Sequence, residues 1–177
     1  FARLGFAAVE RSSLPQAPRG YLHDPVRGRL YAIVHNGLAG SNGGTVLRPL
    51  DGASADAPLE RPGVLEAAWE PAADRLFIAY GAGMGRCGLQ AWRVGAGAGS
   101  VEIPLSGCPT HLATAPGGGL VWVTVAPPAE REPEEARLVA VDGATLEIVY
   151  EVPLGGEADS LAIDARSGRV AVGIGGQ

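Results

Sequence analysis

Residues 138–175 read LVAVDGATLEIVYEVPLGGEADSLAIDARSGRVAVGIG, a stretch of short apolar segments separated by polar turns. Segments 146–154 and 170–174 are rich in β-branched residues, which favour strands. Turns at Asp142-Gly143 and from Asp164 to Gly168 separate the segments. The stretch therefore predicts antiparallel strands joined by tight turns.

Part of this stretch recurs along the chain. Four segments share the order of apolar strand, polar turn and second apolar strand, at residues 20–34, 66–80, 111–125 and 160–174. The turns start at Asp24, Glu70, Ala115 and Asp164, and the second strands start at Leu30, Leu76, Val121 and Val170. These strand starts are spaced by 46, 45 and 49 residues. Such periods are typical of four-stranded propeller blades.

The remainder of each repeat supplies weaker strand patterns. Third strands are predicted at 45–50, 89–94 and 138–142, and fourth strands at 101–105 and 146–154, while 57–60 matches poorly. We therefore predict an all-β fold, a β-propeller of about four four-stranded antiparallel blades. It forms a single domain over 1–177, with repeats at approximately 20–60, 65–105, 110–154 and 159–177. Residues 1–19 are available to complete the last blade.

Composition supports this fold and limits the classes of function. The 177 residues include 27 Gly and 14 Pro, which disfavour long helices. All 14 basic residues are Arg, and the net charge of −5 argues against a general nucleic-acid binder. No apolar run reaches the roughly 18 residues that a membrane span needs. Residues 1–93 carry a balance of +2 and residues 94–177 one of −7, an asymmetry suited to a partner or a second copy.

The stretch 138–175 resembles the YVTN family of β-propeller repeats. The matching positions are Asp142, Thr145, Val152-Pro153, Gly155, Leu161-Ala162, Asp164, Gly168 and 170–172. Ala158 stands where that family often has Pro, and Ala171 replaces the usual Tyr. The resemblance weakens toward the N-terminus and implies a propeller fold, although propellers of this kind serve many unrelated functions.

The period predicts slightly fewer than four blades, which leaves two alternatives for the whole molecule. In the first, residues 1–19 supply the strands missing from the last repeat and close a small four-bladed wheel. In the second, the chain is an arc of a larger wheel that another chain or further residues complete. An arc alone exposes two apolar blade faces, which favours association.

Two cysteines and one glycine-rich motif are candidates for a disulfide, a metal site or a dinucleotide-binding site. In a propeller, the loops that carry Cys87 and Cys108 emerge on one face, so a structural disulfide is favoured over two free thiols or metal ligation. Residues 83–88 match the GxGxxG pattern, but the residues that follow read as a strand and cannot place a helix N-terminus against a dinucleotide. We therefore predict no cofactor and no metal site.

A group of polar residues is predicted at one end of the inner strands, bordering the channel mouth. Glu66 and His111 occupy equivalent repeat positions, shared with Gly20 and Ser160, and Arg19 and Asp159 are their neighbours in sequence. Glu66, His111, Asp159 and Arg19 are the candidate residues for binding a small polar ligand, with His111 able to act as a base. The alternative is that His111 is a strand-start residue satisfied by backbone groups. No catalytic residue is assigned.

From these patterns we predict a non-enzymatic propeller that binds or scaffolds, as a subunit or fragment of a larger extracytoplasmic assembly, periplasmic or secreted. A protein partner or second copy is expected, with a small polar ligand as a further option. No nucleic acid and no membrane span are expected. The alternative is a propeller enzyme of the lactonase or quinoprotein-subunit kind, acting at the channel mouth. A purely structural surface protein made of repeats is a third reading.

Overall fold

The structure is a computed structural model that describes residues 20–35, 44–50, 61–82, 86–93, 99–115, 117–128 and 135–175. Within these ranges every regular element is a β-strand, and all strand pairs are antiparallel. The described part of the chain holds no helix with the length and apolarity that crossing a bilayer requires. The prediction of an all-β fold is therefore confirmed.

Three sheets of four strands and one sheet of two strands follow one another along the sequence. The first contains β1 (Gly20–Asp24), β2 (Arg29–His35), β3 (Gly44–Pro49) and β4 (Arg61–Pro62). The second contains β5 (Val64–Glu70), β6 (Arg75–Ala82), β7 (Arg86–Arg93) and β8 (Ser100–Ile103). The third contains β9 (Cys108–Thr114), β10 (Leu120–Ala126), β11 (Arg137–Asp142) and β12 (Ile148–Pro153). The fourth contains β13 (Ala158–Ile163) and β14 (Val170–Ile174).

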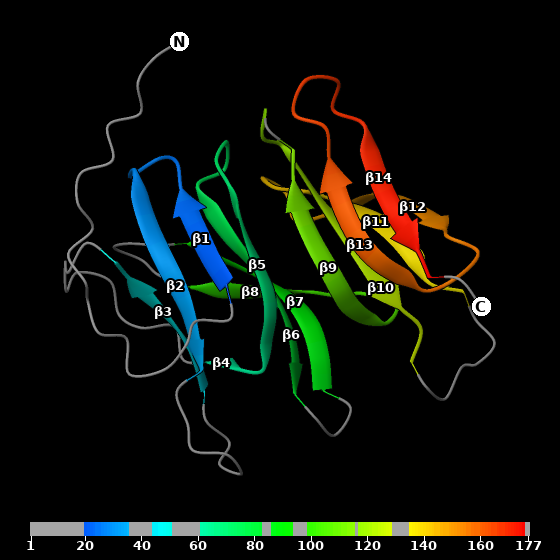
Figure 1. The fold of residues 1–177 in the computed structure, drawn as a ribbon, viewed down its shortest axis with the longest axis horizontal. Coiled ribbons are helices and arrows are strands. Elements are labelled where there is room, and N and C mark those ends of the chain that lie inside the picture. The colour runs from blue at the N-terminus through cyan, green and yellow to red at the C-terminus, as the bar shows by residue number, and fades with distance from the viewer. Residues whose placement is uncertain are drawn as a thin grey trace.

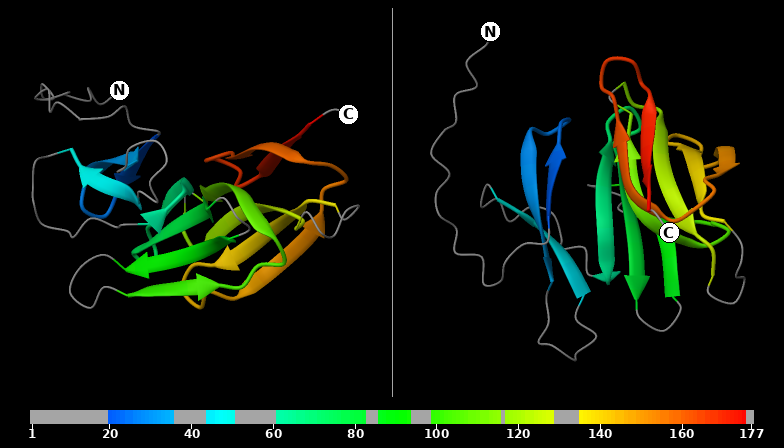
Figure 2. Two further views of the ribbon diagram at one scale, coloured as in Figure 1. Left: turned by 90° about the horizontal axis from the view of Figure 1, so that it is seen from below. Right: turned by 45° about the vertical axis from the view of Figure 1, so that its right-hand side comes forward.

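The four sheets form a curved row. Sheet β1–β4 lies at one end and β13–β14 at the other (Figure 1), and a second view shows both end sheets on the same side of the two middle sheets (Figure 2, left). The first strand of each sheet contacts the first strand of the next, through β1, β5, β9 and β13. These four strands therefore line the inner side of an arc.

Two buried apolar clusters hold the first three sheets together. Between the first and second sheets lie Leu22, Tyr31, Ile33, Val64, Trp69, Leu76 and Ile78. Between the second and third sheets lie Phe77, Leu89, Ala91, Ile103, Leu112, Val121, Val123, Val125, Val139 and Val141. Strand β6 contributes to both clusters because both of its faces are apolar, whereas β10 contributes one face, Val121, Val123 and Val125, to the second cluster.

A charged contact also joins the first two sheets at the β1–β2 turn. The Arg27 guanidinium donates two hydrogen bonds of 2.8 Å to the Asp74 carboxylate and one of 3.1 Å to Asp24. It also lies 5.3 Å from the centre of the Trp69 ring. The hydrogen bonds to Asp74 raise the pKa of Arg27 above its ordinary value. The arginine thus links turns from two neighbouring sheets.

The predicted four-stranded blades are seen only in part at the two ends of the row. In the fourth repeat the described residues hold the two strands that were predicted within 160–174, and no described sheet closes on another. In the first repeat the fourth strand is the two-residue β4 at 61–62, whereas 51–60, including the predicted 57–60, lie outside the described residues. Residues 1–19 also lie outside them, so their part in the last blade stays a prediction.

Candidate functional site

Equivalent positions of the inner strands carry the candidate residues. Gly20, Glu66, His111 and Ser160 pair with Ile33, Ala79, Thr124 and Gly173, so the register repeats from sheet to sheet. In β5, β9 and β13 the residue before this position is unpaired and forms a bulge: Leu65, Thr110 and Asp159. Bulges bend a strand and redirect its side chains. The same bend therefore recurs at the start of three inner strands.

The bends bring Glu66 of β5 against His111 of β9. Glu66 Oε1 lies 3.1 Å from His111 Nδ1, and Glu66 Oε2 accepts a 2.6 Å hydrogen bond from the backbone N–H of Leu112. Because β9 is the first strand of its sheet, the Leu112 N–H faces its open edge, and the carboxylate satisfies it. Glu66 thus fixes both the ring of His111 and the edge of the neighbouring sheet.

The backbone of His111 is held from the other side by Thr124 of β10. Its N–H donates to Thr124 Oγ1 at 3.0 Å, and Thr124 Oγ1 lies 2.7 Å from Thr110 Oγ1. Thr124 is fully buried. Sequence reasoning did not identify Thr124, although it is the one hydroxyl in the apolar run 121–125. That isolated polar residue is the signal that was available.

The pair is open to solvent on its remaining side. The side chain of His111 is 26% exposed and that of Glu66 is 39% exposed. His111 Nε2 has no hydrogen-bond partner among the described residues. When Nδ1 carries the proton toward Glu66, Nε2 is left as an acceptor. This arrangement can bind a hydrogen-bond donor or take up a proton from one.

The other two predicted site residues are not joined to this pair. Asp159 is exposed and is the bulged residue of β13, beside Gly175. No hydrogen bond or ion pair links it to Glu66 or His111 among the residues that the structure describes. Arg19 lies outside the described residues. The geometry therefore supports Glu66 and His111 as a unit and leaves the other two as predictions.

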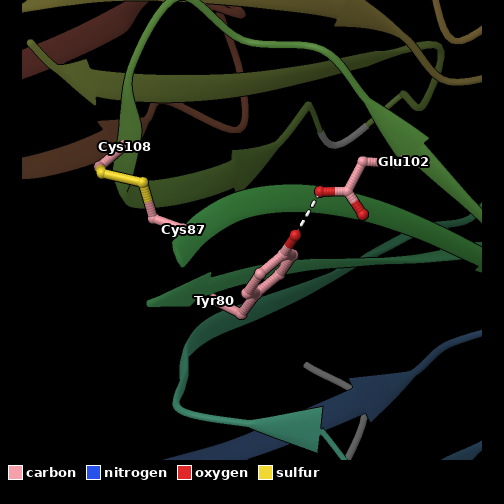
Figure 3. The surroundings of a disulfide bond; sticks show 4 residues. All are labelled: Tyr80, Cys87, Glu102 and Cys108. Atoms are coloured by element: carbon pink, nitrogen blue, oxygen red, sulfur yellow. Dashed lines mark hydrogen bonds between the residues drawn. A yellow bond between two sulfur atoms is a disulfide. The ribbon is translucent and has the colours of Figure 1, made fainter. Parts of the chain in front are cut away.

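The two cysteines form a disulfide between neighbouring sheets. Cys87 of β7 and Cys108, the first residue of β9, are bonded with their Cα atoms 5.2 Å apart (Figure 3). Close to them, the hydroxyl of Tyr80 donates to Glu102, which also accepts from Gln90 Nε2 at 2.7 Å. Among the described residues no group of three or more His, Cys, Asp or Glu side chains is arranged to hold a metal ion.

A groove lies toward the opposite ends of the same inner strands. Its volume is about 410 Å³, and its walls come from β1, β5 and β9 and the turns that follow. They include Tyr21, His23, Trp69 and Thr114. Of these, Trp69 is buried and His23 is exposed. The groove itself had no sequence signal, since small alanines form much of its wall.

Comparison with known proteins supports the fold alone. No protein-family model and no curated protein matches the sequence, so the YVTN resemblance stays a prediction. Among solved structures, TolB from Acinetobacter baumannii is similar, with a TM-score of 0.52 and 14% identity. The match covers 80% of this chain and 34% of the TolB chain, so the chain spans about a third of that protein's length. The likeness indicates a propeller-type fold.

Proposed function

We propose that this chain is a binding module on a propeller-type arc, with a ligand site at the Glu66–His111 pair. The observation that carries the proposal is the bridge between two inner strands, 3.1 Å long, with both side chains partly exposed. An acceptor at His111 Nε2 and a carboxylate beside it suit a small polar ligand that donates hydrogen bonds, such as a polyol or an amine.

We further propose that the arc belongs to a larger assembly, completed by further strands of a longer chain, by a second copy or by a protein partner. Two observations support this. Among the described residues the last sheet has two strands where the others have four, and Tyr150 on the outer strand β12 is 52% exposed. The disulfide supports an extracytoplasmic location, since disulfides persist mainly in oxidising compartments.

The ligand site can be tested with a double variant, Glu66→Ala with His111→Ala. Thermal unfolding is followed with three probes: glucose as a polyol, lysine as an amine and inorganic phosphate as an anion. We expect glucose or lysine to raise the unfolding temperature of the wild type and not that of the double variant. The matched control is Glu147→Ala with His23→Ala, two exposed residues, which should respond as the wild type does.

Two results would contradict the proposal. A probe that stabilises the double variant as much as the wild type would place the binding site elsewhere. Loss of the folded state in the double variant alone would mean that the pair is structural, the alternative reading of His111. Circular dichroism of both variants separates these outcomes before any probe is added.

A catalytic use of the same pair is the second candidate function, and one observation favours it. A carboxylate that holds Nδ1 of a histidine and leaves Nε2 open is the arrangement of a general base. Such a base would activate water for attack on an ester or lactone. Hydrolysis of a γ-lactone by the wild type that His111→Ala removes, with Glu66→Ala reducing it, would favour this function over simple binding.

A further inference from the structure

Strand β9 is attached to the second sheet at two places only a few residues apart. At its first residue, Cys108 is bonded to Cys87 of β7. Three and four residues later, His111 and the Leu112 N–H contact Glu66 of β5. The covalent link and the polar link therefore act on the same short segment of one strand.

This segment is irregularly paired with its own sheet. Pro109 has no N–H to donate, and Thr110 is the bulged residue, out of register with β10. His111 donates its N–H to a side chain, Thr124 Oγ1, and β9 has no strand on its other edge within its sheet. Residues 108–111 stay beside β10 through this bulged pairing and the Thr124 hydroxyl, and the attachments to the second sheet hold the same residues from the other side.

We propose that the Cys87–Cys108 disulfide and the Glu66–His111 pair are coupled, so that the disulfide positions His111 and its reduction releases the pair. In the reduction, two molecules of a low-molecular-weight thiol give up two hydrogens and become one disulfide, and the S–S bond is replaced by two cysteine thiols. No other bond changes. Both cysteines are only half-buried, which leaves the bond within reach of a small thiol.

The coupling has a consequence that requires no ligand. If reduction weakens the Glu66–His111 contact, removal of that contact must by linkage make the disulfide easier to reduce. The effect on ligand binding rests on the proposed function, whereas this reciprocal effect does not. The two proposals can therefore fail independently.

The first test is a thiol–disulfide equilibrium in glutathione buffers, with the oxidised fraction measured by alkylation and mass spectrometry. We expect the equilibrium constant for reduction to be at least about fivefold larger in Glu66→Ala than in the wild type. The matched control is Glu70→Ala, which removes a carboxylate linking the same two sheets at the far end of β5. Its constant should stay within about twofold of the wild type, since it is remote from His111.

The second test observes His111 directly in the wild type. Nitrogen-15 NMR at about pH 8, above the range in which histidines ordinarily titrate, reports which ring nitrogen carries the proton. We expect Nδ1–H in the oxidised protein and a mixture of tautomers after reduction or in Cys87→Ser with Cys108→Ser. His111→Gln identifies the signal among the three histidines.

Any of three results would overturn the coupling. The first is an equal glutathione equilibrium in the wild type and Glu66→Ala. The second is an unchanged Nδ1–H signal in the reduced, folded protein. If instead Glu70→Ala shifts the equilibrium as strongly as Glu66→Ala, the effect reflects general loosening of the two sheets, and the specific coupling is wrong.

Discussion

Glu70 is a fully buried carboxylate at the end of β5, and its oxygens are satisfied by backbone groups of two sheets. It accepts hydrogen bonds from Ala72 at 3.1 Å and Ala73 at 2.6 Å in its own turn. It accepts a third from Gly119 at 2.7 Å, in the β9–β10 turn of the next sheet. One side chain thus shapes its own turn and locks the neighbouring one.

The surrounding glycines leave room for this carboxylate. A Cβ at Gly118 would lie 2.7 Å from Glu70 Oε1, and one at Gly143 would lie 2.8 Å from Glu70 Cγ. Gly118 also has a φ of +73°, which side chains rarely adopt. Glycines in two turns of the third repeat therefore allow the Glu70 side chain of the second repeat to approach closely.

We predict that Glu70→Ala lowers the free energy of unfolding by about 3 kcal/mol, because it leaves three partly buried N–H donors, in the turns of two sheets, without their acceptor. Urea denaturation followed by circular dichroism measures the change. Glu147→Ala, at an exposed turn position, should change stability by less than about 0.5 kcal/mol. Equal effects of the two substitutions would show that solvent satisfies the freed donors.

The repeat pattern predicted part of this arrangement. It aligned Glu70 with Asp24 and Asp164 as the first residue of each turn and showed that Ala115 breaks the series. The cross-sheet hydrogen bond to Gly119 could not be predicted, since it depends on how two sheets are packed. The same holds for Glu66, whose partner at Leu112 is a backbone group that no residue pattern identifies.

Two turns that begin with aspartate share one pattern of hydrogen bonds, in which the carboxylate accepts from groups two and three residues later. Asp142 Oδ1 accepts hydrogen bonds of 2.8 Å from the N–H groups of Ala144 and Thr145. Asp164 accepts from the N–H of Arg166 at 2.8 Å and from the Ser167 hydroxyl at 2.7 Å. These hydrogen bonds lower the pKa of both carboxyl groups below the ordinary value of an aspartate. The largest contribution comes from the backbone N–H of Thr145 for Asp142 and from the backbone N–H of Arg166 for Asp164.

These shifts predict the direction of acid sensitivity. A folded-state pKa below the unfolded one means that the unfolded chain binds more protons, so the stabilisation is present above about pH 4 and is lost as pH falls further. Asparagine keeps the accepting Oδ1 and does not titrate in this range. We therefore expect Asp142→Asn with Asp164→Asn to reduce the loss of stability between about pH 5 and pH 2, measured by urea denaturation.

A control substitution tests whether the two aspartate turns cause this acid sensitivity. Glu147→Gln removes an exposed carboxylate from the same turn region without removing a turn hydrogen bond from a side chain. It should leave the acid profile as in the wild type. A profile for the double asparagine variant that superimposes on the wild type would show that these turns do not carry the acid sensitivity.

Strand positions were predictable from the apolar period, but the bulges were not. The predicted second strands at 30–34, 76–80, 121–125 and 170–174 all lie within β2, β6, β10 and β14. A bulge adds one residue to a strand and leaves its apolar character unchanged, so the pattern conceals it. The bulge at Thr110 nevertheless decides where His111 points, which is why sequence identified the pair but not its geometry.

At the scale of the whole molecule, the number of blades in a closed wheel cannot be predicted from the repeat pattern in the sequence. The period fixes the strands per blade, whereas the closure of a wheel depends on the angle between successive sheets. That angle follows from packing at the two buried clusters and from links such as Arg27–Asp74. The described strands form an open row, whereas the sequence allowed a closed wheel as well (Figure 2).

Packing is uneven along this row. The second and third sheets share a buried cluster, whereas no cluster of buried residues covers β13 and β14 in the described part of the chain. Val170, Val172 and Leu161 are only partly buried, and Ile174 is exposed. The last sheet therefore gains less from apolar burial than the middle two, and its strands should open without unfolding the rest.

Amide hydrogen exchange tests this inference, because it measures opening strand by strand. We expect amides bonded between β13 and β14 to exchange at least about tenfold faster than those between β10 and β11. Two matched substitutions locate the cause. Val123→Ala, in the cluster between the second and third sheets, should accelerate exchange throughout both sheets, since it destabilises their shared core. Val172→Ala should accelerate exchange in β13 and β14 alone. Equal protection of all four sheets, with both variants acting globally, would mean that the arc unfolds as one unit, and its last sheet would then need no further strands to be stable.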